Sequence, residues 1–124
     1  MTRFLCVLWD DPMYKFMIIF RQSEDVDQFE GQYNEFLSRV EKMPGVVRRQ
    51  VADVIGSPTG QSPYYRILEV YYNNRREMEL SLATPIGQDA GRRLQLFPPG
   101  TVEMVFANVY EEAGGWPPER TGEM

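Results

Sequence analysis

The stretch with the most potential for chemistry is residues 63–72, PYYRILEVYY, in which a single carboxylate stands among tyrosines. Aromatic and branched residues are typical of a β-strand, and in a regular strand Tyr65, Glu69 and Tyr71 share one face. A carboxylate buried in a central strand must be paired, hydrogen-bonded or protonated. Glu69 is therefore our candidate general acid or base. A purely structural salt bridge or hydrogen bond is the alternative.

Two arginines of the preceding segment, which is expected to be a polar edge strand, are the expected partners of Glu69: Arg48 and Arg49. Arg66 points to the opposite face of its own strand. Asn108, in an otherwise apolar run, is a second polar candidate, with hydrogen bonding to buried backbone as the alternative. The tyrosines either pack in the core or contact a bound ligand. An aromatic wall with a few polar groups suits a small apolar or aromatic molecule.

The composition excludes several classes of site. The chain has no histidine and a single cysteine, Cys6. Histidine triads, histidine-based zinc sites, proximal-histidine haem sites and intrachain disulfides are therefore excluded. Residues 56–60 (GSPTG) lack the lysine and the helix of a phosphate-binding loop, and no metal-ligand spacing is present. We expect no cofactor and no metal.

The net charge of the chain and the length of its apolar segments restrict the binding partners and the cellular location that we expect. With 13 basic and 18 acidic residues the net charge is −5, which disfavours nucleic acid. The apolar segment at residues 4–9 (FLCVLW) is too short for a signal peptide or a membrane span, so we expect a cytoplasmic protein. The 124 residues fit one domain. We expect an N-terminal extension at 1–13, the domain at 14–112 and a tail at 113–124.

The apolar periodicity and the turn residues predict four strands and three helices. The strands are expected at 15–21, 46–55, 64–72 and 101–110, and the helices at 25–41, from Asn74 onward, and at 85–96. Two successive βαβ halves indicate an α+β, ferredoxin-like split βαβ fold with a four-stranded antiparallel sheet. The most apolar strands, the first and third, are predicted to be central. The second and fourth are predicted to be edges.

One face of this sheet would stand open, because the helices of the topology all cover the other face. Both alternating sets of the first strand are apolar, for example Met17 and Ile19 against Ile18 and Phe20. An apolar face of that extent exceeds what a monomer usually exposes. We therefore predict a homodimer through the open sheet face. The alternative is that residues 1–13 and 111–124 cover this face within one chain.

Four sequence motifs together resemble the EthD family of dimeric α/β-barrel proteins, over residues 14–112. They are MPGV at 43–46, PYYRILEVYY at 63–72, LATPIGQDA at 82–90 and NVYEE at 108–112. The resemblance implies a ferredoxin-like protomer whose dimer closes two sheets into a barrel. Most members have no established reaction, and relatives in fungal aromatic pathways include dehydratases or related enzymes.

The chain departs from the family late in its first helix. Many members carry a His-Leu-Pro run there, and the matching positions are Phe36, Leu37 and Ser38. No imidazole can be carried over. We count Phe36 with Tyr65, Tyr71 and Asn108 as candidate ligand contacts, with packing in the core as the alternative for Phe36.

Two functional hypotheses follow. The first is a binding or accessory protein of catabolism or biosynthesis that holds a small hydrophobic or aromatic molecule in the dimeric barrel. The second is a cofactor-independent enzyme that performs proton transfer, dehydration or isomerisation on a small aromatic metabolite, with Glu69 as acid or base. An enzyme requires a pocket with a titratable group at its wall.

Overall fold

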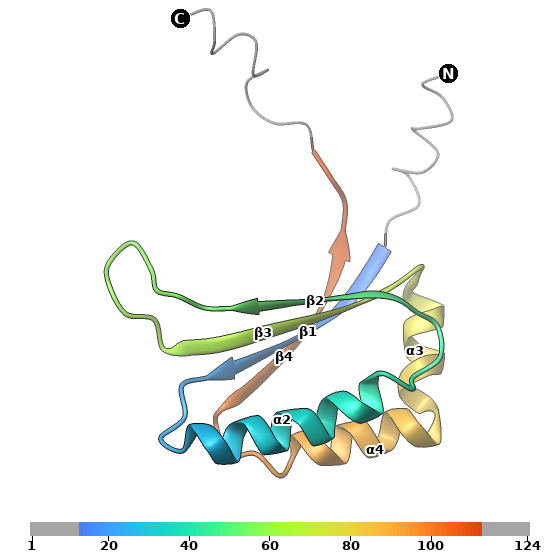
Figure 1. The fold of residues 1–124 in the computed structure, drawn as a ribbon. Coiled ribbons are helices and arrows are strands. Elements are labelled where there is room, and N and C mark those ends of the chain that lie inside the picture. Colours follow the sequence, from blue (N-terminus) through green and yellow to red (C-terminus); the bar gives the residue numbers. More distant parts are fainter. Residues whose placement is uncertain (1–12, 113–124) are drawn as a thin grey trace, which may run out of the picture.

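The computed structural model describes residues 13–112, which form a four-stranded sheet with three helices on one side (Figure 1). The elements are β1 (Met13–Arg21), α2 (Val26–Val40), β2 (Val46–Asp53), β3 (Tyr64–Tyr72), α3 (Arg75–Ala83), α4 (Pro85–Leu94) and β4 (Val102–Val109). The predicted tail, the apolar segment at 4–9 and the rest of the extension before Met13 lie outside the described residues. The α+β, ferredoxin-like prediction is confirmed.

The sheet has the strand order β2-β3-β1-β4, and all neighbouring strands are antiparallel. The apolar strands β1 and β3 are central and β2 and β4 are edges, as predicted. β1 begins at Met13 rather than at residue 15, because Met13 still pairs with Val109 of β4. β2 ends at Asp53 rather than at residue 55, where its register with β3 ends at the Asp53–Arg66 pair.

Each helix begins at a side chain that accepts a backbone N–H group, which is the usual function of an N-cap. The accepting oxygens belong to Asp25, Asn74 and Thr84, and the donors are the N–H groups of Gln28 (3.0 Å), Glu77 (2.9 Å) and Gly87 (3.1 Å). Pro85 then occupies the first turn of α4, where its missing N–H costs nothing. α4 ends at Leu94, two residues before the predicted end, because Leu96 and Phe97 bond to the carbonyls three residues earlier.

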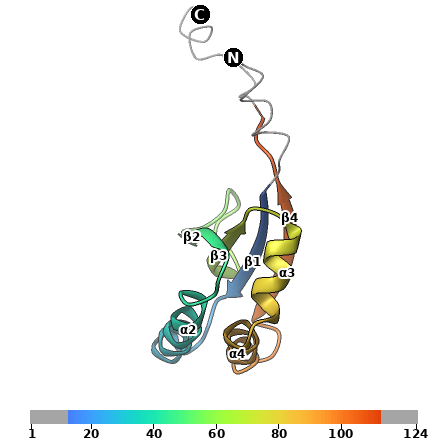
Figure 2. The same ribbon diagram turned by 90° about the vertical axis from the view of Figure 1, so that its right-hand side faces the viewer.

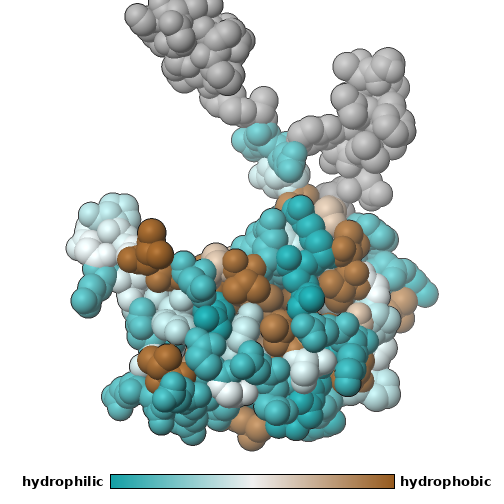
Figure 3. Space-filling model, in the orientation of Figure 1, coloured by the Kyte–Doolittle hydropathy of each residue, from teal (hydrophilic) through white to brown (hydrophobic). Residues whose placement is uncertain are grey.

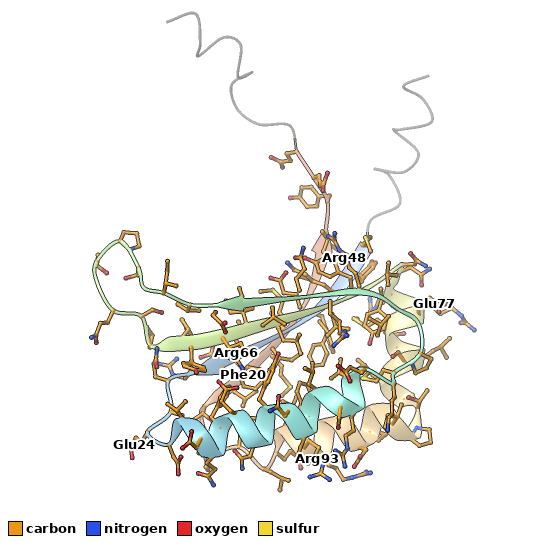
Figure 4. The ribbon with its side chains drawn as sticks, in the orientation of Figure 1. Phe20, Glu24, Arg48, Arg66, Glu77 and Arg93 are labelled. Carbon is orange, nitrogen blue, oxygen red and sulfur yellow. The ribbon has the colours of Figure 1, made fainter. Side chains whose placement is uncertain are left out.

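The core lies between the sheet and the helices, and Phe20 is at its centre with no exposed surface. Figure 4 shows Phe20 directed from the sheet toward α2. Its ring contacts the rings of Phe29 (5.4 Å between centroids), Tyr33 (5.5 Å), Phe36 (6.3 Å) and Phe97 (5.2 Å). These contacts join β1, α2 and the segment that follows α4.

The helices leave the second face of the sheet uncovered by any described element. Figure 2 shows α2 and α4 side by side below the sheet, with α3 beside β1. Within residues 13–112 no helix is long and apolar enough to cross a membrane.

Candidate functional site

A cavity of about 600 Å³ lies between the helix-covered face of the sheet and helices α2 and α4. Its floor and walls are apolar side chains of the central strands and of both helices. They include Phe16, Ile18, Val70 and Tyr72 from the sheet and Phe36, Val40, Ala90 and Leu94 from the helices. Sites for small molecules usually measure about 300–1,000 Å³ and are mostly apolar. The cavity has the size and the lining of such a site.

Small residues of α4 keep this space open. Gly87, Ala90 and Gly91 all line the cavity. A Cβ atom at Gly87 would collide with the backbone carbonyl oxygen of Ser81, so glycine there lets α4 approach the end of α3. A Cβ atom at Gly91 would meet no atom within 4 Å, so a larger side chain at this position has room to enter the mouth of the cavity.

Tyr72 brings a polar group to the cavity wall. The residue is fully buried, and its hydroxyl lies 3.0 Å from the hydroxyl of Ser81 on α3. Burial raises the pKa of Tyr72, so the phenol is neutral at neutral pH and acts as a hydrogen-bond donor or acceptor. The Tyr72 hydroxyl thus already has a hydrogen-bond partner on α3.

The mouth of the cavity lies between α4 and β4, where the lining residues are exposed. On the helix side these are Gln88, Arg92 and Gln95, and on the strand side the turn at 98–100 and Met104, which is 55% exposed. Charged and amide groups are thus gathered on the helix side of the rim, whereas its strand side and the floor of the cavity are apolar.

Phe36 is the predicted ligand contact that lines this cavity. It is 2% exposed and packs in the core, which is the alternative foreseen for it, and its contact with a ligand stays a prediction. The resemblance to the EthD family implies a histidine at this position in many members. In this chain the wall carries a phenyl ring there.

Tyr65 lies on the helix-covered face of the sheet, and the prediction that it shares a face with Glu69 is wrong. A register shift near the end of β1 gives β3 one extra residue at this point. Such a bulge interrupts the alternation of side chains. The Tyr65 hydroxyl donates to Glu30 of α2 at 2.9 Å, and its ring contacts Phe29 at 5.0 Å between centroids.

Glu69 lies on the open face, where its carboxylate is paired and hydrogen-bonded. Tyr71 donates its hydroxyl to one oxygen at 2.8 Å, and the Lys15 ammonium is 3.3 Å from the other. The predicted pairing with Arg48 or Arg49 is wrong, because the register of β1 and β3 places Lys15 opposite Tyr71, next to the carboxylate. Arg48 stacks instead on the Tyr71 ring, at 4.3 Å from its centroid.

These residues form a polar group that we name the open-face cluster, consisting of Lys15, Arg48, Gln50, Glu69 and Tyr71. Figure 4 shows Arg48 on the opposite side of the sheet from Phe20. Tyr71 is 4% exposed although no helix covers it, because the side chains around it exclude water. The cluster is separated from the cavity by the full thickness of the sheet.

The last predicted contact, Asn108, is exposed near the end of β4, opposite Tyr14 of β1. It lines neither the cavity nor the open-face cluster. Residues 13–112 hold no group of three or more histidine, cysteine, aspartate or glutamate side chains that could bind a metal ion.

The sequence interpretation missed Tyr72, Arg92 and the small residues of α4. The spacing of Gly87, Ala90 and Gly91 on one side of a helix was the available signal. It also missed the ion-pair network of Arg66, which donates two hydrogen bonds to Glu30 at 2.9 and 3.0 Å and one to Asp53 at 2.7 Å. This network ties β3 to α2 and to β2.

No known protein-family model matches the chain. An uncharacterised 11.0 kDa protein of the thcB–thcC intergenic region of Rhodococcus erythropolis is 28% identical over 98 residues, which cover 77% of this chain and 94% of the relative. The crystal structure of an EthD family protein from Bacillus halodurans matches with a TM-score of 0.73 at 26% identity, and covers 82% of this chain and 99% of that one. The chain is similar to EthD proteins. The resemblance inferred from the sequence motifs is thereby confirmed.

More distant structures share the fold. A dimeric ferredoxin-like protein of unknown function from Jannaschia has a TM-score of 0.62 at 12% identity, over 78% of this chain and 99% of its own. Two enzymes are also similar. A hydroxynitrile lyase from Passiflora edulis has a TM-score of 0.59 at 11% identity, over 84% of this chain and 99% of its own. The cofactor-independent oxygenase SnoaB from Streptomyces nogalater has a TM-score of 0.57 at 13% identity, over 82% of this chain and 96% of its own. At these identities the likeness establishes the fold alone.

Proposed function

We propose that the protein binds a small apolar or aromatic molecule in the cavity between the sheet and helices α2 and α4. The observation that carries the proposal is the apolar cavity of about 600 Å³ between the sheet and helices α2 and α4. An apolar ligand gains free energy by leaving water for such a lining.

A binding or accessory role in catabolism or biosynthesis fits this cavity better than acid–base catalysis. Among the described lining residues there is no carboxylate, and Phe36 stands where the family resemblance implies histidine. The titratable groups at the wall are the phenol of Tyr72 and the guanidinium of Arg92. Burial raises the pKa of Tyr72, so this phenol does not exchange a proton readily at neutral pH.

The alternative function, a cofactor-independent enzyme with Glu69 as acid or base, is favoured by the contacts of Glu69 with Tyr71 and Lys15. SnoaB, a cofactor-independent oxygenase, has a similar fold. The reaction would then take place on the open face of the sheet. Glu69→Gln would abolish it without affecting a ligand in the cavity, which is the experiment that separates the two functions.

We further propose that two copies of the chain pair through the open face. Apolar side chains of three strands reach this face, among them Met17, Ile67 and Val105, which is 46% exposed. In the view of Figure 3, apolar side chains reach the surface at separate places along the sheet. The dimeric state of similar proteins such as the one from Jannaschia supports this pairing. A second copy removes the apolar surface from water without closing the cavity, which lies on the other face.

Binding to the cavity is tested with N-phenyl-1-naphthylamine, a neutral apolar fluorophore whose emission rises when it leaves water. We expect the wild type to bind the probe. Gly91→Trp places an indole at the cavity mouth, and Ala90→Leu extends a buried side chain that lines the cavity. Each is expected to weaken binding by about tenfold or more, since crowding a filled site costs about 1–3 kcal/mol.

Gly31→Trp is the matched control. Gly31 is also a helical glycine whose added Cβ would meet no atom within 4 Å, but it does not line the cavity. This variant is expected to bind the probe like the wild type. Unchanged affinity in both Gly91→Trp and Ala90→Leu would place the probe elsewhere and contradict the proposal.

A further inference from the structure

We infer that Arg92 makes the cavity selective for amphipathic ligands that carry an anionic group, with the apolar body between the sheet and the helices and the anion at the mouth. The inference rests on the proposed binding function and adds the class of ligand to it. Carboxylate and sulfonate groups represent the chemistry, because a guanidinium binds planar or tetrahedral oxyanions with its forked N–H groups.

The position of Arg92 supports this assignment. It belongs to the exposed lining residues at the mouth, and it is the cationic side chain among the described residues that line the cavity. Gln88, one turn earlier on the same rim, already donates its amide to the carbonyl oxygen of Leu82 at 3.0 Å. The charged side chain that a ligand contacts when it fills the cavity and reaches the mouth is therefore Arg92.

The ion pairs around Arg92 leave positive charge at the mouth. Arg39 approaches both neighbouring carboxylates closely, Asp89 at 2.9 Å and Glu35 at 2.7 Å. Arg92 is 3.4 Å from Asp89, and Arg93 is 3.9 Å from Glu35. Three guanidinium groups thus share two carboxylates. Arg92 has a side chain that is 67% exposed and is held by a longer contact than Arg39, so it can turn toward a ligand.

Two effects oppose an anion and set the expected size of the selectivity. The chain has a net charge of −5, and Arg92 lies in the last turn of α4, at the negative end of the helix dipole, which repels negative charge. The attraction of the Arg92 guanidinium for the anion has to exceed both of these repulsions at a solvent-exposed position. We therefore expect an effect of about threefold in affinity, typical of an exposed ion pair and sensitive to salt.

The test compares two probes of nearly the same apolar body, 1-anilinonaphthalene-8-sulfonate and neutral N-phenyl-1-naphthylamine. Arg92→Gln is expected to weaken the sulfonate probe by about threefold at low salt and to leave the neutral probe unchanged. High salt is expected to weaken the sulfonate probe in the wild type but not in this variant. Arg92→Lys keeps the charge and is expected to restore part of the lost affinity.

Arg93→Gln is the control, because Arg93 is the next residue of α4 and does not line the cavity. It removes one positive charge from the same helix, so it reports any general effect of charge, and we expect it to weaken the sulfonate probe clearly less than Arg92→Gln does and to leave the neutral probe unchanged. Gly91→Trp shows in parallel that both probes occupy the cavity.

The outcomes separate this inference from the proposed function. If Arg92→Gln binds the sulfonate probe as tightly as the wild type, or if Arg93→Gln weakens it equally, the selectivity assigned to Arg92 is wrong, while neutral-probe binding in the cavity still stands. If neither probe binds the wild type, or if Gly91→Trp and Ala90→Leu bind both probes normally, the proposed function fails and the inference fails with it.

Discussion

The two faces of the sheet differ although they are built from alternate residues of the same strands. In β1, Ile18 and Phe20 face the helices and are fully buried, whereas Met17 and Ile19 face the open side and are half-buried. The helix-covered face is apolar and encloses a cavity. The open face mixes apolar side chains with the open-face cluster. Apolar residues are therefore abundant on both faces for different reasons. On one face they form the core and the cavity, and on the other they form the surface that we propose pairs with a second copy.

The charged groups of the open face fit a surface that is solvated before assembly. The Lys15–Glu69 pair is about one-fifth exposed on each side, and Tyr71 satisfies one carboxylate oxygen. A partner copy that covered these groups would have to leave every one of them hydrogen-bonded, since an unpaired buried charge is costly. Within the cluster the contacts of Glu69 with Lys15 and Tyr71 meet that condition, and Arg48 contacts the Tyr71 ring.

The largest expected difference between the faces is in stability. Phe20→Ala removes a fully buried ring at the centre of the aromatic core and should lower the free energy of unfolding by about 3–5 kcal/mol. Ile19→Ala, the adjacent residue on the open face, should cost clearly less in the monomer, because its side chain is only half-buried. Urea denaturation at a protein concentration below dimerisation measures both. Equal losses would contradict the view that the core lies on one face.

The second difference is in assembly. Val105→Glu places a carboxylate on the open face of each copy, and should raise the dissociation constant of the dimer by about a hundredfold, or about 3 kcal/mol. Val51→Glu is the control. Val51 is an exposed valine on the other edge strand, paired with Leu68 of the helix-covered face. Analytical ultracentrifugation should find the control dimeric, and dimers of equal strength in both variants would place the interface elsewhere.

The smallest expected effect comes from the ion pair that joins the helix-covered face to α2. The Arg66 guanidinium holds the pKa of Glu30 below its usual value of 4.5. Since the unfolded chain then binds the proton more tightly, the stability from Glu30 is present above pH 4.5 and is lost as the pH falls through the lowered pKa. Because the carboxylate is 35% exposed and screened by solvent, Glu30→Gln should cost about 1 kcal/mol at neutral pH.

Urea denaturation as a function of pH measures this effect. The stability difference between wild type and Glu30→Gln should shrink in acid as the wild-type carboxylate becomes protonated. The control is Glu79→Gln, which breaks an exposed pair with Arg75 and should cost less than about 0.5 kcal/mol. A stability difference for Glu30→Gln that stays constant into acid would contradict the role of this carboxylate.

The fold could be predicted because its determinants are local in the sequence. The caps at Asp25, Asn74 and Thr84 mark the helix starts by residue type, and the apolar run of β1 identifies a central strand. The EthD resemblance was likewise visible in short motifs. None of these signals requires knowledge of which side chains meet across the molecule.

The site could not be predicted in the same way because it depends on register and packing distance. No glycine or proline marks the bulge that moves Tyr65 to the helix-covered face. The partner of Glu69 depends on the register of β1 with β3, which places Lys15 next to the carboxylate. The cavity depends on how closely α4 approaches α3 at Gly87. The sequence therefore identified Phe36, which lines the cavity, but it could not show that Tyr65 and Glu69 lie on opposite faces of the sheet.

The central claim is that the ligand and the partner copy use opposite faces of the sheet. Titration of the Val105→Glu variant, shown to be monomeric, with N-phenyl-1-naphthylamine tests this most directly. We predict that the monomer binds the probe with the affinity of the wild-type dimer, because the cavity lies on the helix-covered face of the sheet, away from the proposed interface. Loss of probe binding together with the dimer would show that the site lies between the two sheets, and would contradict the account.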